Sequence, residues 1–270
     1  MATATNEALA NALAALESSA ATAELSWATD LFGALNVIDE NAALRRALTD
    51  PSREPEARAG LVRTLFGERI GDKAREVLEG LARSRFSTER DLGDTLELVA
   101  AITATTVAEK ADGAAGLDKL QTELLGFVDL VASDHELQWA LTDPQAPVDA
   151  KVELAQKLVP QASDVTRTLL AQAVSHPRGL RPTALVERFA EIAAHRQQRF
   201  IATVSVTRPL TDSQRERLQA GLNSMYGREL RLNEVIDPAV VGGVRIVVGD
   251  EVVDATAASR LADLRRKLAS

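Results

Sequence analysis

The five residues ALTDP occur twice in this chain, at positions 47–51 and 140–144, which are 93 residues apart. The same shift places the apolar residues Leu31, Leu35 and Ile38 on Leu124, Val128 and Val131. It also matches Ala57, Leu61, Leu65 and Arg85 with Ala150, Leu154, Leu158 and Arg178, and Leu92, Leu96 and Val99 with Leu185, Phe189 and Ile192. A slip of one or two residues would turn each helix away from its apolar face. An offset that holds over about 70 residues therefore indicates an internal duplication of a helical unit.

Apolar residues three and four positions apart predict helices throughout residues 1–199. The first covers 6–20, with Leu9, Leu13 and Leu16 on its buried side. Thr88, with Asp91 three residues later, predicts the capped start of a long helix that reaches about Lys110. The two glycines of residues 111–117 predict a break between the copies. Nothing after this break repeats the first helix, so the long helix is a candidate to serve both copies.

The pattern changes after residue 199 to a mixture of strands and helices. Residues 200–207 are β-branched and predict a strand, and Thr211 with Gln214 predicts a capping box for a helix that Gly227 ends. Leu218, Leu222 and Met225 are expected on its buried side, followed by a strand through Leu230 and Leu232. Residues 244–253 predict a hairpin with a turn at Gly249-Asp250, and residues 257–268 predict a last helix. The predicted order is β-α-β-β-β-α.

These patterns predict a mainly α protein: two tandem helical-bundle units followed by a small α/β domain. The proposed boundaries are 1–110 for a first bundle, 111–199 for a second bundle and 200–270 for the α/β domain. The chain has 270 residues, 46% of them hydrophobic, which is enough for such cores. Only 3% are aromatic, which favours close-packed helices rich in alanine and leucine.

Charge and cysteine content exclude several classes of protein. The net charge is −8, from 31 basic and 39 acidic residues, whereas a nucleic-acid-binding surface is basic. There is no cysteine and therefore no disulfide or thiolate metal site. No apolar run approaches the roughly 20 residues that span a bilayer, and residues 1–13 lack the basic and apolar regions of a secretion signal. We expect a protein with no nucleic-acid partner and no direct membrane insertion.

The residues that usually carry chemistry are scattered. His135, His176 and His195 are far apart and show none of the spacings of zinc sites. Gly242-Gly243 lacks the third glycine and the following helix of a dinucleotide-binding loop. Asp237, Asp250 and Asp254 occur at turns and a strand end, where aspartate is common. We therefore predict no catalytic centre, no metal and no cofactor.

The region from about Gly116 to Ser270 resembles the delta subunit of bacterial rotary ATP synthases, the oligomycin-sensitivity-conferring protein family. The resemblance is strongest from TVSVTRPLTDS through IDPAVVGGVRIVVGDEVVD to the final RLADLRRKL. Differences from the family pattern are Thr207-Arg208 at the strand end, Val240-Val241 before the glycines and Ala255-Thr256 after the hairpin. The largest difference is the duplication: the second copy is similar to the family's own N-terminal domain, and the first copy is additional.

The resemblance implies a non-catalytic stator subunit on the cytoplasmic face of the cell membrane, peripheral to it. The helical domain would bind N-terminal helices of the alpha subunits, and the C-terminal domain would bind the C-terminus of the b subunit. We hypothesise an alpha-subunit groove that includes Leu169, Leu170, Ala173 and Val174. We hypothesise a b-stalk contact that includes Val240, Val241, Val244 and Leu261. The rival interpretations are a free helical adaptor or scaffold outside any membrane complex and, more distantly, a small hydrolase that uses the carboxylates near Asp250.

Overall fold

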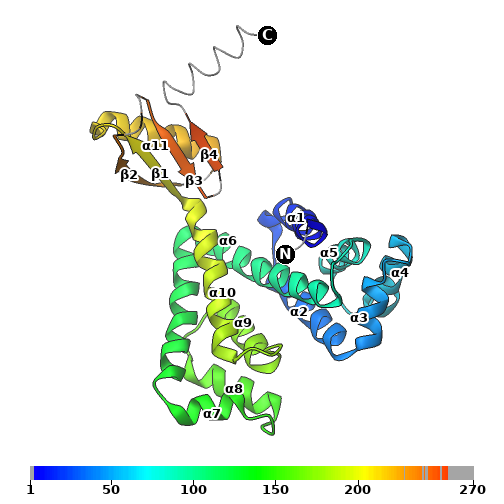
Figure 1. The fold of residues 1–270 in the computed structure, drawn as a ribbon. Coiled ribbons are helices and arrows are strands. Elements are labelled where there is room, and N and C mark those ends of the chain that lie inside the picture. The colour runs from blue at the N-terminus through cyan, green and yellow to red at the C-terminus, as the bar shows by residue number, and fades with distance from the viewer. Residues whose placement is uncertain (1–2, 228, 239, 241–242, 250, 255–270) are drawn as a thin grey trace. The chain divides into compact units, whose positions relative to one another are not determined.

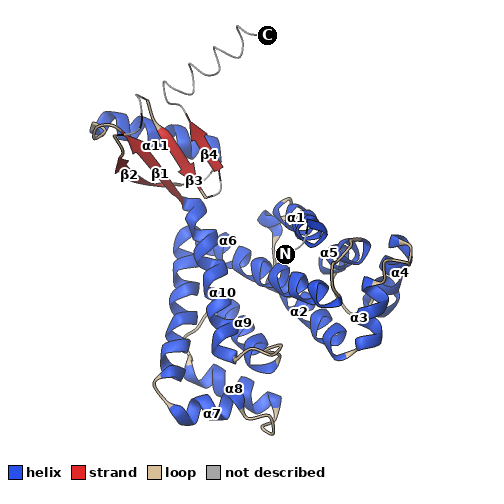
Figure 2. Ribbon diagram, in the orientation of Figure 1, coloured by secondary structure: helices blue, strands red, loops and turns tan. Residues whose placement is uncertain are grey.

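A computed structural model of the chain describes residues 3–227, 229–238, 240, 243–249 and 251–254. Contacts divide the chain into two compact units, Met1–Ala193 and Ala194–Ser270. The regular structure of the first unit is helical, and the strands are confined to the second unit (Figures 1 and 2). The predicted class, mainly α with an α/β C-terminal part, is confirmed. The division into three domains stays a prediction.

The first unit begins with a series of helices, and one of them, Ala42–Thr49, is capped by a side chain. The Asn41 side chain accepts a hydrogen bond from the Leu44 amide (3.0 Å) and Pro55 stands in the first turn of its helix, where no amide donor is needed. Gly67 is the C-cap residue of the helix that begins at Pro55, and its φ of −54° is right-handed. The bounds are α1 Thr3–Glu17, η1 Ala20–Thr22, α2 Leu25–Glu40, α3 Ala42–Thr49, α4 Pro55–Phe66 and α5 Asp72–Arg83.

The long helix α6 (Glu89–Ala132) joins the two halves of this unit. Thr88 and Asp91 form the predicted capping box at its start. Helical geometry is interrupted at Asp112 (φ −152°) and at Gly113 (φ 54°), within the predicted break. Since a positive φ is strained for residues with a Cβ atom, glycine permits this bend. Figure 1 shows the two parts of α6 running in different directions on either side of the bend.

The remaining helices repeat the spacing of the earlier ones. They are α7 His135–Thr142, α8 Val148–Leu158, α9 Asp164–Ser175 and α10 Pro182–Gln197. The bounds of α3 and α7 differ by 93 residues at both ends, and those of α5 and α9 differ by 92. A shift of α1 by 93 residues falls on residues 96–110, inside the first part of α6. The counterpart of α1 is therefore a segment of α6 and not a separate helix.

Local contacts also recur between the two halves. The Asp30 carboxylate accepts a hydrogen bond from the Gly71 amide (2.8 Å), and the Glu123 carboxylate accepts one from the Ser163 amide (3.0 Å). In both ALTDP segments the aspartate accepts from the amide two residues later, at 2.9 Å. These pairs stand at offsets of 92 and 93 residues. They support the proposed duplication.

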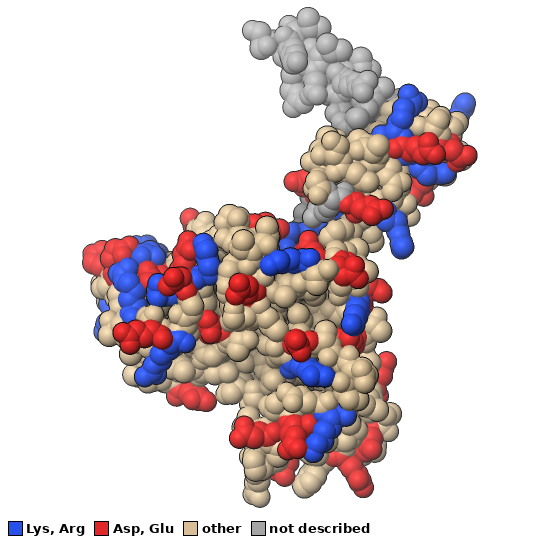
Figure 3. Space-filling model, turned by 180° about the vertical axis from the view of Figure 1, so that it is seen from behind, with Lys and Arg blue, Asp and Glu red and all other residues tan. Residues whose placement is uncertain are grey.

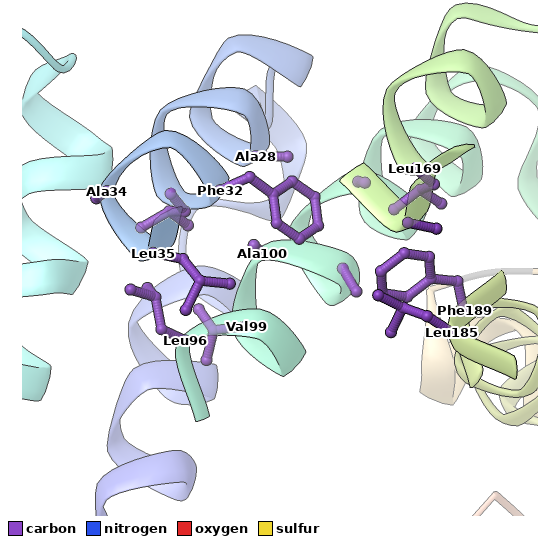
Figure 4. Close-up of a cluster of buried hydrophobic side chains, with 14 of the residues drawn as sticks. Ala28, Phe32, Ala34, Leu35, Leu96, Val99, Ala100, Leu169, Leu185 and Phe189 are labelled. Carbon is purple, nitrogen blue, oxygen red and sulfur yellow. The ribbon is translucent and has the colours of Figure 1, made fainter. Parts of the chain in front are cut away.

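One hydrophobic core runs through the whole helical unit. Phe32 of α2 points toward Leu169 of α9 and Phe189 of α10, and Leu35 of the same helix lies beside Leu96 and Val99 of α6 (Figure 4). All five leucine and phenylalanine side chains are at most 3% exposed, and full burial of such a side chain contributes roughly 1.5–3 kcal/mol. No helix in the described residues is both long and apolar enough to cross a membrane.

In its described residues, the second unit is a four-stranded sheet packed against one helix. Its elements are η2 Gln198–Phe200, β1 Ile201–Val206, α11 Asp212–Tyr226, β2 Arg231–Ile236, β3 Arg245–Val248 and β4 Glu251–Asp254. The strand order is β2-β1-β3-β4, with β1 parallel to β2 and antiparallel to β3, which in turn is antiparallel to β4. Residue pairs such as Ile201↔Arg231 and Ala202↔Val248 fix the register. Alternate residues of β1 are buried, as one covered sheet face requires.

The details of α11 correct one prediction. The Thr211 and Gln214 capping box is present, and Gly227 ends the helix with a left-handed φ of 64°. Met225, however, is 68% exposed, because Leu218, Leu222 and Tyr226 at a spacing of four form the side that faces the sheet. The prediction that Met225 is buried is wrong. The predicted last helix, 257–268, and Asp250 of the predicted turn lie outside the described residues.

Candidate partner-binding surfaces

The four residues of the hypothesised alpha-subunit groove lie on α9, and all are buried. Leu169, Leu170 and Ala173 have no exposed surface and Val174 is 2% exposed. They belong to the core that both halves of the helical unit share. Ala173→Glu would place a charge in that core and destabilise the fold, so this substitution does not test partner binding separately from folding.

The hypothesised b-stalk contact is only partly described. Val240 is 7% exposed, and Val244 packs against the core of the second unit. Val241 and Leu261 lie outside the described residues. Exposed apolar side chains of this unit are found instead on its outer strands and on α11: Met225, Val235, Ile236 and Val252 are 40–68% exposed.

A groove of about 840 Å³, which we call the Trp139 groove, lies between the second part of α6, α7 and the start of α10. Val128, Val131 and Val174 form its apolar floor, so one of the hypothesised residues does line an open surface. Two large apolar side chains at this groove face solvent: Trp139 is 69% exposed and Leu180 is 40% exposed. Exposed tryptophan beside an apolar groove is typical of protein contact surfaces.

The corresponding groove in the first half is polar. It has about 560 Å³ and is lined by Arg46, Arg53 and Ser87, among others. With the 93-residue offset, Arg46 corresponds to Trp139 and Ser87 to Leu180. Comparison of the two copies could have identified Trp139 as a surface residue, because a core position holds apolar residues in both copies.

A third hollow, of about 530 Å³, lies between α1 and α5. Small residues line it on the α1 side, including Ala4, Ala8 and Ala12, and Gly80 lines it on the α5 side. A Cβ atom on Gly80 would meet no other atom within 4 Å, so the hollow is open at this position. Narrow side chains of this kind let a helix approach closely, and we call this hollow the α1–α5 cleft.

Arg178 connects the two halves through an ion-pair cluster that the sequence did not predict. Its guanidinium contacts Asp39 of α2 and lies 3.0 Å from Asp94 and 2.9 Å from Glu97 of α6. Burial alone would lower the pKa of Arg178, but hydrogen bonds to Glu97 and Asp39 outweigh this effect and raise the pKa. Arg188 lies 3.5 Å from Glu97, so two cations share three carboxylates.

The backbone at Arg178 is unusual as well. Its φ of 51° is left-handed, and Gly179 follows with a φ of 83°. A residue with a Cβ atom in this region costs roughly 1–2 kcal/mol. Because the side chain is held by three carboxylates, we infer that these contacts maintain the left-handed turn.

The described residues contain no group of three or more histidine, cysteine or acidic side chains that could hold a metal ion. His176 lies 3.5 Å from Glu40, and His135 lines the Trp139 groove. Acidic and basic side chains are interspersed over the face of the helical unit in Figure 3, with no extended patch of one sign. The features that stand out are grooves and apolar surface rather than a cluster of reactive side chains.

The fold and these surfaces define a helical protein with a small α/β unit and with open grooves between its helices. A family model described as ATP synthase delta (OSCP) subunit matches residues 99–268. The chain therefore belongs to the ATP synthase delta (OSCP) subunit family, whose members are non-catalytic subunits of ATP synthase. This result excludes the rival interpretation as a hydrolase.

Relatives named ATP synthase subunit delta match along the whole chain. Those of Pseudarthrobacter chlorophenolicus and Renibacterium salmoninarum are 54% and 50% identical, with 100% of both chains covered in each case. That of Streptomyces griseus is 37% identical, also with 100% of both chains covered. The family model starts within α6, yet these relatives also match α1–α5. The additional helical segment is therefore shared by these bacterial relatives.

A solved structure of the Toxoplasma gondii mitochondrial ATP synthase contains a chain that aligns with 63% of this chain and 96% of its own length. The identity is 20% and the TM-score is 0.36, which is too low to support an argument about this chain.

Proposed function

We propose that this chain is a peripheral-stalk subunit that links the catalytic head of ATP synthase to the membrane-anchored b subunit. In this proposal the helical unit binds N-terminal helices of the alpha subunits and the α/β unit binds the C-terminus of b. The complex works at the cytoplasmic face of the cell membrane. The observation that carries the proposal is family membership together with two compact units, each with a core of its own.

Physical requirements of a stator agree with this role. A part that resists torque needs stiffness and two separate attachment surfaces, and it needs no nucleophile. The helical unit has one continuous core and a buried ion-pair cluster that ties α2 to α6 and to the segment before α10. Its hollows between helices are the kind of surface that accepts an amphipathic partner helix. We also propose the domain boundaries 1–110, 111–199 and 200–270 for this arrangement.

The assignment of partners can be tested by separation of the two units. A chain that ends at residue 199 keeps the helical core, so we expect it to bind isolated catalytic heads as the full chain does. It should lose binding to a peptide of the b C-terminus, because it lacks the α/β unit. Circular dichroism of the truncated chain is the control for folding. Full-strength binding of the b peptide by this shorter chain would refute the proposed partner assignment.

The rival function is a free helical adaptor outside any membrane complex. Co-purification of the full chain with membrane-bound ATPase activity distinguishes the two. Vesicles stripped of this subunit should lose ATP-driven proton transport and regain it when the full chain is added back. A chain that stays in a separate complex and does not restore transport would favour the adaptor.

A further inference from the structure

The α1–α5 cleft has a counterpart in the second half of the helical unit. The 93-residue offset places α1 on residues 96–110 of α6, and the 92-residue offset places α5 on α9. The counterpart therefore lies between the first part of α6 and α9. If the two copies behaved alike, this place would be a second open cleft.

The counterpart is closed. Glu7 and Asn11 of α1 are exposed at the open cleft, whereas the residues 93 positions later, Ala100 and Ala104, have no exposed surface. Gly80 of α5 is also exposed, whereas Gln172, 92 positions later on α9, is 5% exposed. A segment of the chain must cover these residues.

The segment that covers them is α2. Asn36 of α2 and Gln172 of α9 exchange two amide hydrogen bonds, at 3.2 and 2.9 Å. The Phe32 ring lies 6.1 Å from the Phe189 ring, centre to centre, with the planes at 55° (Figure 4). Amide pairs and tilted aromatic pairs of this kind fix a helix in one register.

Polar contacts at the end of α2 extend the same interface. Asp39 pairs with Arg178, and Glu40 lies 3.5 Å from His176. At the 93-residue offset Arg178 corresponds to Arg85, and at the 92-residue offset of α5 and α9 His176 corresponds to Ser84. Both of these first-copy residues line the open α1–α5 cleft. Gln172, His176 and Arg178 thus hold α2 at positions whose counterparts in the first copy are open.

We infer that α2 is the resident helix of the second copy, so that the duplication leaves this chain with one open cleft of this kind and not two. The arrangement also shows what the open cleft fits: an amphipathic helix with an acidic residue that can meet Arg85, as Asp39 meets Arg178. Within the described residues no ion pair involves Arg85. The inference rests on the proposed function where it takes the alpha-subunit N-terminal helix as the partner.

Gly80 provides a direct test in the full chain. A side chain at this position has open space, so Gly80→Phe should fill the cleft without disturbance of α5. The matched control is Gly126→Phe on the second part of α6, where an added Cβ also meets no atom within 4 Å. The probe is a synthetic peptide of the alpha-subunit N-terminus that carries a photo-crosslinker, and calorimetry gives the number bound per chain.

We expect one peptide bound per wild-type chain, with crosslinks on α1 and α5. Gly80→Phe should weaken binding at least about tenfold, as the loss of a central contact does, and Gly126→Phe should leave it unchanged. Two peptides per chain, crosslinks on α9 or residues 96–110, or binding that survives Gly80→Phe would overturn the inference. A wild-type chain that binds no peptide would overturn it too, while restored proton transport in stripped vesicles would still uphold the proposed function.

Discussion

At the scale of single residues, Arg178 supplies the buried ion pairs that tie α2, α6 and the segment before α10 together. Its side chain is 12% exposed and the Glu97 side chain 4%, so the pair is shielded from water and weakly screened. Gly93 fits the same site, because a Cβ atom there would collide with the Arg178 guanidinium. The neighbouring helix thus has glycine where the guanidinium passes.

Replacement of Arg178 by methionine should destabilise the helical unit by about 3 kcal/mol, since Asp39, Asp94 and Glu97 lose the cation they share. Urea unfolding monitored by circular dichroism measures this. The control is Arg90→Met: Arg90 also lies near Asp94, at 3.7 Å, but is 71% exposed, so a change below about 1 kcal/mol is expected. Equal decreases in the free energy of unfolding of the two variants would show that burial of Arg178 adds nothing to stability.

At the scale of elements, each half of the helical unit uses a carboxylate to hold the start of a later helix. Glu123 of α6 accepts hydrogen bonds from the Ser163 amide and hydroxyl, at 3.0 and 2.8 Å, and from the Thr166 hydroxyl at the start of α9. Burial alone would raise the pKa of Glu123, but the hydrogen bonds from Thr166 and Ser163 outweigh it and lower the pKa below its ordinary 4.5. The charge also suits a helix N-terminus.

A pH dependence follows from this lowered pKa. A carboxyl group whose pKa is lower in the folded than in the unfolded state stabilises the protein above the unfolded value and loses this contribution as pH falls through the folded value. The free energy of unfolding should therefore fall below about pH 4.5. In Glu123→Gln this part of the fall should be absent, and unfolding of both proteins at pH 3 to 7 measures it. The same slope in both would assign the acid sensitivity to other carboxylates.

At the scale of the whole molecule, the chain combines two units with separate cores. The helical core includes residues of both copies, whereas the core of the α/β unit contains Ala202, Val204 and Leu222 among others. The two copies should therefore unfold together, and the α/β unit should unfold on its own.

Two core variants test this division. Val204→Ala should reduce the free energy of unfolding of the α/β unit by roughly 1–3 kcal/mol. In calorimetry the transition of that unit should therefore move to a lower temperature, and the helical transition should stay in place. Leu31→Ala should reduce the free energy of unfolding of the helical unit by roughly 3 kcal/mol, because Leu31 has no exposed surface in the helical core. The transition of the α/β unit should stay in place. A single transition that both variants shift would contradict the separation, and three transitions would show that the copies unfold independently.

The sequence by itself determined the helices, the α/β order up to β4 and the family, and the 93-residue offset that it shows reappears in the bounds of α3 and α7. Each of these depends on local spacing: helical and strand periods show which side of an element is buried, and caps show where it ends. The sequence also grouped residues 169, 170, 173 and 174 as a hypothesised partner groove, and the structure shows all four buried in the core.

Only the tertiary structure decided what covers those sides. Period alone does not tell which helix lies on an apolar face, because that depends on contacts between residues far apart in the chain. Therefore α2 on α9, Asp39 with Arg178 and the open Trp139 groove could not be read from spacing. Residues 96–110 of α6, which lie 93 positions after α1, are a further example, because only packing in three dimensions settles which neighbours cover that segment.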